Sequence, residues 1–362
     1  MVSRSITFSE LCSELLEVYR QILGERCFEA LRRTTGPTGT RLRLIQNVQE
    51  RGSLSLQTSS VDDAIAFLEA LLDCVGLASA TQGLTQKSYA LAVGDPSQLG
   101  RSSYRRGKFG YRRGKLKENE QQLLDWYFSV LVQGWAHSKG IGPLKDLHLQ
   151  KRFKKSRVCD YMVSMKEDNV ELLECKRIHP ESLSYNPIKD TVKKILNKLP
   201  EVVAQFDSTE KVINKTVVCR HLLVDISAYG NKLRLRQLKT RTLKVLGYEG
   251  DMVEEILAQL MENCNSGVDK ITLCWRNFIF IDDIPRAIVQ HTLNTVLYNE
   301  AISAFDYEGW TVAGYPQEET DFGELRVSST ARSLEWISTT YNNLFDPKTF
   351  YKLGPEHKLR QS

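Results

Sequence analysis

The chain has 362 residues, 41% of them hydrophobic and 26% charged, and a net charge of +5. These values are ordinary for a soluble globular protein of one or two domains. No run reaches the roughly 18 apolar residues of a membrane span, and the acidic residues Glu10, Glu14 and Glu17 are wrong for a signal peptide. The sequence therefore argues against a membrane protein, and we expect a cytoplasmic location.

Residues 1–93 are predicted to form a small, mainly helical accessory unit. Residues 6–23 repeat apolar side chains at intervals of three and four after a Ser/Glu start that resembles a capping box. Residues 61–76 begin with acidic residues, which favours a second helix. Between them, residues 41–45 alternate polar and apolar side chains and predict a short strand. This unit is the expected surface for a protein partner or a second copy of the chain.

Residues 94–117 are rich in Gly, Ser, Pro, Tyr and Arg and predict a flexible loop or linker. The pentapeptide Tyr-Arg-Arg-Gly-Lys occurs twice, at 104–108 and 111–115. Residues 101–160 contain 15 Lys and Arg against 5 Asp and Glu, and charge so concentrated indicates a polyanionic partner. The alternative is a merely solvated linker. The candidate nucleic-acid contacts are Arg105, Arg106, Lys108, Arg112, Arg113 and Lys115.

Residues 118–305 are expected to form an α/β domain. A helix at 116–138 would bury Leu124, Phe128, Leu131 and Trp135, with Glu120 on the same stripe. A short strand near 145–153 and a hairpin follow. The hairpin has arms at 158–163 and 170–178 and a turn at 166–169.

A helix and a strand complete this pattern. Pro187 would open the helix, which runs to Phe206, and a strand is predicted at 216–226. Further along, we expect a helix at 250–263, a strand at 270–281, and a helix at 284–304 capped by Asp282 and Asp283. Residues 306–362 are a C-terminal extension without a clear pattern. This order predicts a mixed central sheet flanked by helices.

The eight cysteines form no CxxC pair and have no His at a zinc-ligand spacing. We therefore expect buried, reduced thiols.

An acid, any residue and then Lys occurs three times, but only Glu174-Cys-Lys176 lies in a predicted apolar strand. Alternation places Glu174 and Lys176 on one strand face, and the hairpin would bring Asp160 close to Glu174. Two carboxylates with water suit Mg²⁺ or Mn²⁺. A neighbouring Lys can polarise or deprotonate the attacking water and stabilise the phosphorane charge. The alternative is a salt bridge between Glu174 and Lys176 at a sheet edge.

This segment is similar to the PD-(D/E)XK nuclease superfamily, with Asp160 in the place of the signature aspartate and Glu174-Cys-Lys176 as the second half. The resemblance covers roughly 116–226 and implies a restriction-endonuclease-like core. It also implies a metal-ligating acid on the preceding helix, for which Glu120 is the candidate. A polar residue on the following helix is implied as well, with Lys189, Lys193 and Gln205 as candidates.

The resemblance implies a Mg²⁺-dependent nuclease that hydrolyses DNA phosphodiester bonds with metal-activated water. Asp160, Glu174 and Lys176 would be the catalytic residues, and Asp160, Glu174 and Glu120 the metal ligands. RNA as substrate stays open, as does a catalytically silent nucleic-acid-binding protein on the same scaffold. Restriction, phage defence, repair and mobile-element roles are all compatible with this reading.

Overall fold

The computed structural model describes residues 8–23, 25–33, 37–51, 65, 67–70, 72, 128–129, 131–133, 135–136, 144–147, 158–166, 168–178, 186–227, 236–237, 243–264, 267–281, 284–297, 310–316, 322–328 and 331–345. Within these residues no helix combines the length and the apolar character that a membrane crossing requires.

The described strands form one mixed sheet in the order β1-β2-β3-β4-β7-β8-β9-β10, with β6 beside β7 and β5 beside β6. The pairs β3–β4 and β4–β7 are parallel, and the other pairs are antiparallel. The strands are β1 (Lys145–Asp146), β2 (Tyr161–Ser164), β3 (Asn169–Arg177), β4 (Thr216–Asp225), β5 (Arg236–Gln237), β6 (Leu243–Leu246), β7 (Lys270–Ile281), β8 (Ile284–Val296), β9 (Trp310–Pro316) and β10 (Phe322–Ser328). An α/β fold with a mixed sheet flanked by helices is therefore confirmed.

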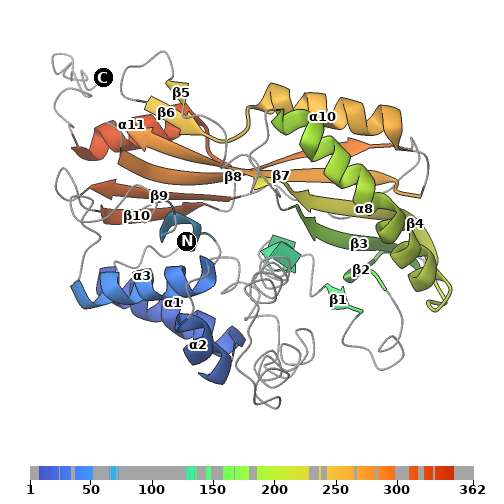
Figure 1. Ribbon diagram of the computed structural model, residues 1–362, viewed down its shortest axis with the longest axis horizontal. Helices are drawn as coiled ribbons and strands as arrows, with labels where there is room; N and C mark the ends of the chain where they lie inside the picture. The colour runs from blue at the N-terminus through green and yellow to red at the C-terminus, as the bar shows by residue number, and fades with distance from the viewer. Residues whose placement is uncertain are drawn as a thin grey trace, which may run out of the picture.

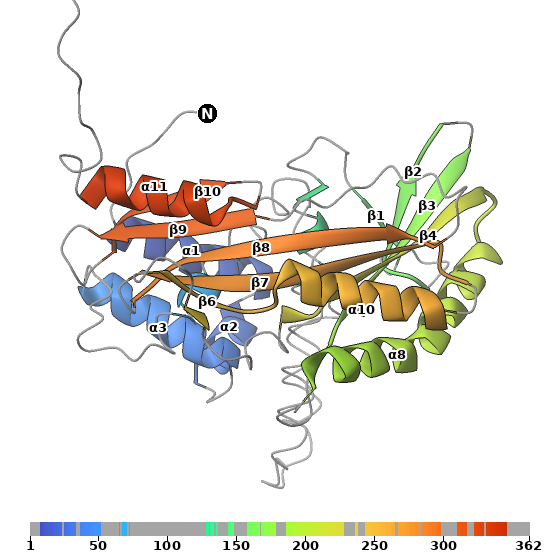
Figure 2. The same cartoon turned by 90° about the horizontal axis from the view of Figure 1, so that it is seen from above.

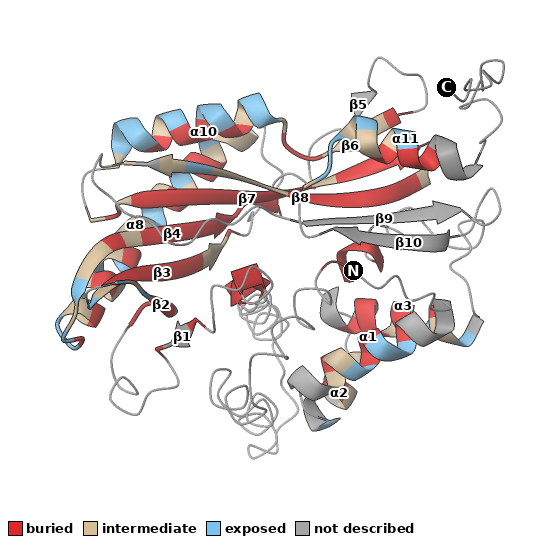
Figure 3. Cartoon of the chain, turned by 180° about the vertical axis from the view of Figure 1, so that it is seen from behind, coloured by how far each residue is buried: buried red, intermediate tan, exposed pale blue. Residues whose placement is uncertain are grey.

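Helices cover both faces of this sheet. The helices described over their full length are α1 (Phe8–Leu23), α2 (Glu25–Arg32), α3 (Pro37–Arg51), α8 (Pro187–Glu210), α10 (Gly250–Asn263) and α11 (Leu334–Phe345). The N-terminal helices lie on the opposite side of the sheet from α10 and α11 (Figure 1). Because both faces are covered, the residues of β7 are buried along nearly its whole length (Figure 3).

Alternation along each strand divides the core into layers. Leu173 and Leu223 belong to the core cluster that contains Ile45 of α3. Their sequence neighbours Leu172 and Val224 belong to the cluster of α8 and α10, two helices that lie side by side (Figure 2). Farther along β7 and β8, Ile279 and Val289 pack with Ile337 of α11.

The β3–α8–β4 unit positions the candidate site. The sequence around Pro187 explains why α8 starts there. Asn186 caps α8 by accepting the Lys189 backbone N–H at 3.0 Å, and Pro187 occupies the first turn. The helix and the strand after it were both predicted. The apolar period of the sequence predicts Leu199 and Val203 on the buried face of this helix, but Val202 and Phe206 are buried there and Leu199 and Val203 are only partly buried.

A row of hydrogen-bonded polar side chains crosses four strands of the sheet. Nδ1 of His221 lies 2.8 Å from Oε1 of Glu171, and its Nε2 lies 2.7 Å from Oγ1 of Thr272. The Thr272 hydroxyl donates to Oδ1 of Asn294 at 2.5 Å. Glu171, His221 and Thr272 are all 0% exposed, so these three side chains cannot touch a substrate, whereas Asn294 at the end of the row is exposed.

Two predicted elements are wrong in type. Residues 41–45 belong to α3, because the apolar residues Leu42, Ile45 and Val48 recur every three positions and are buried together. Residues 284–296 form β8 instead of a helix, so the expected helix cap at Asp282 and Asp283 is also wrong. The β-branched residues of β8 favour a strand, and its long antiparallel pairing with β7 fixes it.

The predicted C-terminal extension contributes to the main sheet. β9 pairs with β8 and β10 pairs with β9, so residues 310–316 and 322–328 continue the sheet of the central domain. The described parts of two other predicted helices are helical, at residues 65–72 and 128–136.

Candidate functional site

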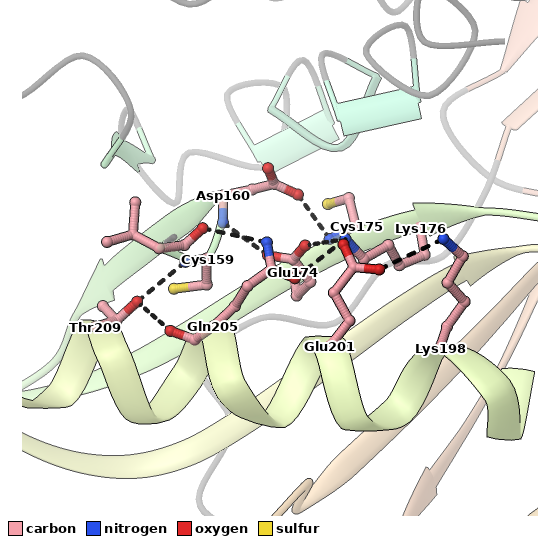
Figure 4. Close-up of polar contacts among 10 residues, drawn as sticks. Cys159, Asp160, Glu174, Cys175, Lys176, Lys198, Glu201, Gln205 and Thr209 are labelled. Atoms are coloured by element: carbon pink, nitrogen blue, oxygen red, sulfur yellow. Dashed lines mark hydrogen bonds and ion pairs between the residues drawn. The ribbon is translucent and has the colours of Figure 1, made fainter. Parts of the chain in front are cut away.

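Asp160 and Glu174 lie opposite each other where the β2–β3 hairpin opens. Backbone pairing of the two strands ends at Tyr161 and Leu173. Beyond that pair, two side-chain carboxylates accept hydrogen bonds from backbone N–H groups of the opposite strand. The Asp160 N–H donates to Oε2 of Glu174 at 3.1 Å, and the Cys175 N–H donates to Oδ2 of Asp160 at 2.8 Å (Figure 4). The structure therefore brings the two predicted carboxylates together.

Lys176 joins them from the same face of β3. Its Nζ lies 2.6 Å from Oε1 of Glu174 and 3.7 Å from Oε1 of Glu201, and it donates to Oε1 of Gln205 at 3.2 Å. The Glu174 side chain is 1% exposed and that of Lys176 is 21% exposed, so the ammonium lies between the core and the solvent. The three predicted catalytic residues form one contiguous cluster.

The salt bridge that the sequence left as an alternative is present, but its setting differs. β3 lies between β2 and β4, although its pairing with β2 ends at Leu173, just before Glu174. Asp160 and two residues of α8 share the cluster with the ion pair. A simple edge salt bridge is thus an incomplete description of this site.

The charge on Lys176 is stabilised by its carboxylate neighbours. Burial lowers the pKa of Lys176, but attraction and a hydrogen bond from Glu174, with further attraction from Asp160 and Glu201, outweigh burial and raise the pKa above its ordinary value of 10.5. The folded protein therefore holds this proton more tightly than the unfolded chain does.

This linkage predicts a loss of stability in alkali. The contribution of Lys176 should be fully present below pH 10.5, the ordinary pKa, and should vanish as pH rises through the higher pKa of the folded state. Urea unfolding of the wild type and of Lys176→Gln, compared at neutral pH and across the alkaline range, should show a shrinking difference in the free energy of unfolding. A difference that grows with pH would contradict this linkage.

Helix α8 holds the strand that carries Asp160. Gln205, which contacts Lys176 through Oε1, donates from Nε2 to the Val158 carbonyl at 3.4 Å. One turn later, Oγ1 of Thr209 accepts the Cys159 backbone N–H at 3.0 Å and donates to the Gln205 carbonyl at 2.7 Å. These bonds fix the chain just before Asp160 against α8.

Of the three polar candidates on this helix, Gln205 is the one in the cluster. Lys189 and Lys193 are exposed nearer the start of α8. The sequence did not predict Glu201 or Thr209, although each is four residues from Gln205 and therefore lies on the same helix face. That spacing is the signal that points to them.

Several predicted residues lie outside the described part of the chain. These are the proposed metal ligand Glu120 and the basic residues Arg105, Arg106, Lys108, Arg112, Arg113 and Lys115. Their assigned roles stay predictions. Phe128, Leu131 and Trp135, farther along the same predicted helix, are buried as expected.

The carboxylate side chains at the site are of the type that binds a divalent cation. No group of three His, Cys, Asp or Glu side chains within the described ranges is arranged to hold a metal ion. Mg²⁺, however, is commonly bound through one or two carboxylates, with water and phosphate oxygens completing its shell. Asp160 and Glu174 supply such oxygens, and they are the residues of this structure that would hold the ion.

The cysteines beside the site are not nucleophiles. Burial, above all, raises the pKa of the Cys159 and Cys175 thiols well above its ordinary value, and the nearby Asp160 and Glu174 carboxylates raise it further. Because the thiolate is the reactive form, both thiols are inert at neutral pH. Five of the six described cysteines are buried, as the sequence predicted, and Cys264 is partly exposed.

Comparison of the chain with protein-family models, with curated proteins and with solved structures found no match. The geometry of the site therefore carries the functional argument alone, and membership of the PD-(D/E)XK superfamily stays a prediction.

Proposed function

We propose that this chain is a Mg²⁺-dependent nuclease that hydrolyses DNA phosphodiester bonds, with Mn²⁺ as an alternative ion. The convergence of Asp160, Glu174 and Lys176 at one hairpin end supports this proposal most strongly. Carboxylates repel a polyanion, so a surface that only binds phosphates gains nothing from them. A cation between them and the substrate removes that repulsion.

The chemical roles follow from the charges. Hydrolysis forms a P–O bond to water and breaks a P–O ester bond, and negative charge grows on the phosphate oxygens in the transition state. The Lys176 ammonium can stabilise that charge. Its raised pKa keeps it protonated at neutral pH, which favours an electrostatic role over that of a general base. Asp160 and Glu174 would hold the cation, which when bound supplies charge neutralisation and a more acidic water.

The strand order supports a restriction-endonuclease-like core as part of the proposal. β1, β2 and β3 form an antiparallel meander, α8 follows, and β4 returns parallel to β3. The family resemblance implies the same order of elements: a β-meander, then a helix, then a strand. Residues 128–136, helical where described, would be the preceding helix.

One observation favours a second candidate, a catalytically silent nucleic-acid-binding protein. Both carboxylate oxygens of Glu174 already have protein partners, since Oε1 pairs with Lys176 and Oε2 accepts the Asp160 N–H. A cation would have to share these oxygens, which the additional lone pairs of a carboxylate allow.

The decisive test is incubation of the purified protein with supercoiled, linear and single-stranded DNA and with RNA, in Mg²⁺, in Mn²⁺ or in EDTA. We expect cleavage of DNA with either ion and none in EDTA, because chelation removes the cation. Cleavage of RNA alone would change the proposed substrate from DNA to RNA and would leave the site assignment unchanged. Tight binding with no cleavage under any condition would favour the silent binding protein.

The duplicated Tyr-Arg-Arg-Gly-Lys segment is proposed to add non-specific affinity for the phosphate backbone. Arg forks can pair with phosphate oxygens, and Tyr can stack on an exposed base. Changing Arg105, Arg106, Arg112 and Arg113 to Gln should weaken binding across DNA sequences. Each lost contact should reduce the slope of log affinity against log salt by about 0.9 on duplex DNA. If the affinity and the slope are unchanged in the quadruple variant, this segment is a linker that does not contact DNA.

A further inference from the structure

Lys176 contacts an oxygen of Glu174 that a divalent cation would also need. Its Nζ lies 2.6 Å from Oε1 of Glu174, whereas Oε2 of Glu174 accepts the backbone N–H of Asp160 at 3.1 Å. The backbone donor is fixed by the hairpin, but the ammonium lies at the end of a flexible side chain, so Oε1 is the oxygen that can be released. A divalent cation on Oε1 would lie beside the ammonium, and like charges at such short range repel each other. The site therefore binds a cation more tightly if the ammonium can move to another acceptor.

Helix α8 provides such an acceptor. Oε1 of Glu201 lies 3.7 Å from Nζ of Lys176, and Oε1 of Gln205 accepts a hydrogen bond from the same Nζ at 3.2 Å. Glu201 and Gln205 are four residues apart and therefore share one face of the helix. Figure 4 shows Glu201 on α8 between Gln205 and Lys198, facing the strand that carries Lys176. The ammonium thus already lies between Glu174 on one side and two acceptors of α8 on the other.

The exposure of these side chains favours a movement of the ammonium toward Glu201. The Glu174 side chain is 1% exposed, that of Lys176 21% and that of Glu201 46%. Moving from Glu174 to Glu201 therefore takes the ammonium from the core toward solvent, where a charge costs less. A shift of about 1 Å would bring the 3.7 Å contact with Glu201 to the roughly 2.8 Å of a charge-assisted hydrogen bond. The four-carbon stem of a lysine allows such a shift.

Glu201 is placed to act on Lys176 and not on a cation directly. Among the residues that the structure describes, Asp160, Glu174 and Glu201 are not arranged as a three-carboxylate group that could hold a metal ion. Lys198 pairs with Glu201 at 3.5 Å from the same helix, so one end of α8's contact with β3 is an exposed ion pair. Exposed pairs of this kind contribute little to stability, and the contact with Lys176 is the one that links Glu201 to the candidate site.

We propose that Glu201 is a positioning residue of the candidate site: the Lys176 ammonium moves from Glu174 to Glu201 when a divalent cation binds, and Oε1 of Glu174 is then available to the cation. Gln205 remains a neighbour of the ammonium in both positions. This inference rests on the proposed nuclease function and explains how one site can contain both a lysine and a cation. It also keeps the Lys176 charge on the solvent side of the carboxylates, the side from which a phosphate would arrive.

The test measures cation binding separately from cleavage. Mn²⁺ is titrated into the full chain without nucleic acid, and the electron paramagnetic resonance signal of free Mn²⁺ reports the affinity. Glu201→Gln should weaken Mn²⁺ binding by about three- to tenfold, which is within the usual coupling between residues of one salt-bridge network. Lys176→Gln should tighten Mn²⁺ binding, because it removes the ammonium that competes for Oε1 of Glu174.

The double variant Lys176→Gln/Glu201→Gln separates positioning from direct attraction of the cation. If Glu201 acts through Lys176, its replacement should have little effect once Lys176 is gone, so the double variant should bind Mn²⁺ about as tightly as Lys176→Gln. If Glu201 binds the cation or attracts it by its own charge, its replacement should cost the same affinity in both backgrounds.

Thermal unfolding controls for a folding defect. Because the pair of Glu201 with Lys198 is exposed, Glu201→Gln should unfold at the same midpoint as the wild type. The matched control Glu254→Gln removes an exposed carboxylate of α10 outside the site. It should change neither the midpoint nor the Mn²⁺ affinity.

Three outcomes would overturn the inference: no Mn²⁺ binding by the wild type, an unchanged affinity in Glu201→Gln, or equal losses with and without Lys176. The nuclease proposal has a separate fate. Cleavage of DNA in Mg²⁺ with no coupling between Glu201 and Lys176 would keep the nuclease and reject this positioning role. Coupling in the Mn²⁺ titration without cleavage of any nucleic acid would keep the positioning role and reject the nuclease.

Discussion

Glu174→Gln should lower the rate of DNA cleavage by on the order of 10²–10³-fold or more, the loss typical when one group that stabilises transition-state charge is removed. Glu174 is 1% exposed and pairs with Lys176 at 2.6 Å, so the isosteric amide keeps the shape of the site and removes its buried charge. Asp160→Asn and Lys176→Gln should cause losses of similar size. Single-turnover cleavage with saturating Mg²⁺ measures the effect on chemistry.

The matched control is Glu254→Gln, an exposed position on α10 outside the site, which should cleave at the wild-type rate. DNA affinity in EDTA should change little in Glu174→Gln, because the phosphate contacts are proposed to lie elsewhere. If Asp160→Asn, Glu174→Gln and Lys176→Gln all cut DNA as fast as the wild type, the site assignment is wrong.

His221→Leu should lower the free energy of unfolding by about 3–5 kcal/mol, the usual cost of removing one partner of a buried pair. Nδ1 of His221 lies 2.8 Å from Oε1 of Glu171, and both side chains are 0% exposed. The substitution leaves a carboxylate in the core without its imidazole. Urea unfolding at neutral pH measures the loss.

The double variant Glu171→Met/His221→Leu provides the internal control. Replacing both partners of a buried pair by apolar groups leaves no charge unsatisfied, so the double variant should be more stable than His221→Leu alone. A double variant less stable than the single one would show that the pair is not the source of the effect.

Alternation along short segments was sufficient to predict the hairpin and its charged end. Glu174 and Lys176 share a face of β3 because side chains in a strand alternate, and Asp160 comes opposite Glu174 because the turn fixes the register. The helix that starts at Pro187 could also be predicted, since its cap and its apolar period are local features.

Elements with two competing local signals were decided by the tertiary structure. Residues 284–296 carry apolar side chains at spacings that a helix also allows, and pairing with β7 makes them a strand. Residues 41–45 alternate like a strand, yet burial of Leu42 and Ile45 in the helical core makes them part of α3. In both cases non-local packing selected between two local preferences.

The sequence alone therefore determined which residues carry the candidate chemistry: two carboxylates and a lysine whose spacing in a hairpin brings them together. The tertiary structure decided what surrounds them. Glu201 and Gln205 reach Lys176 from a helix more than twenty residues farther along the chain. Such contacts depend on how a helix lies across a sheet, and no short sequence pattern encodes that placement.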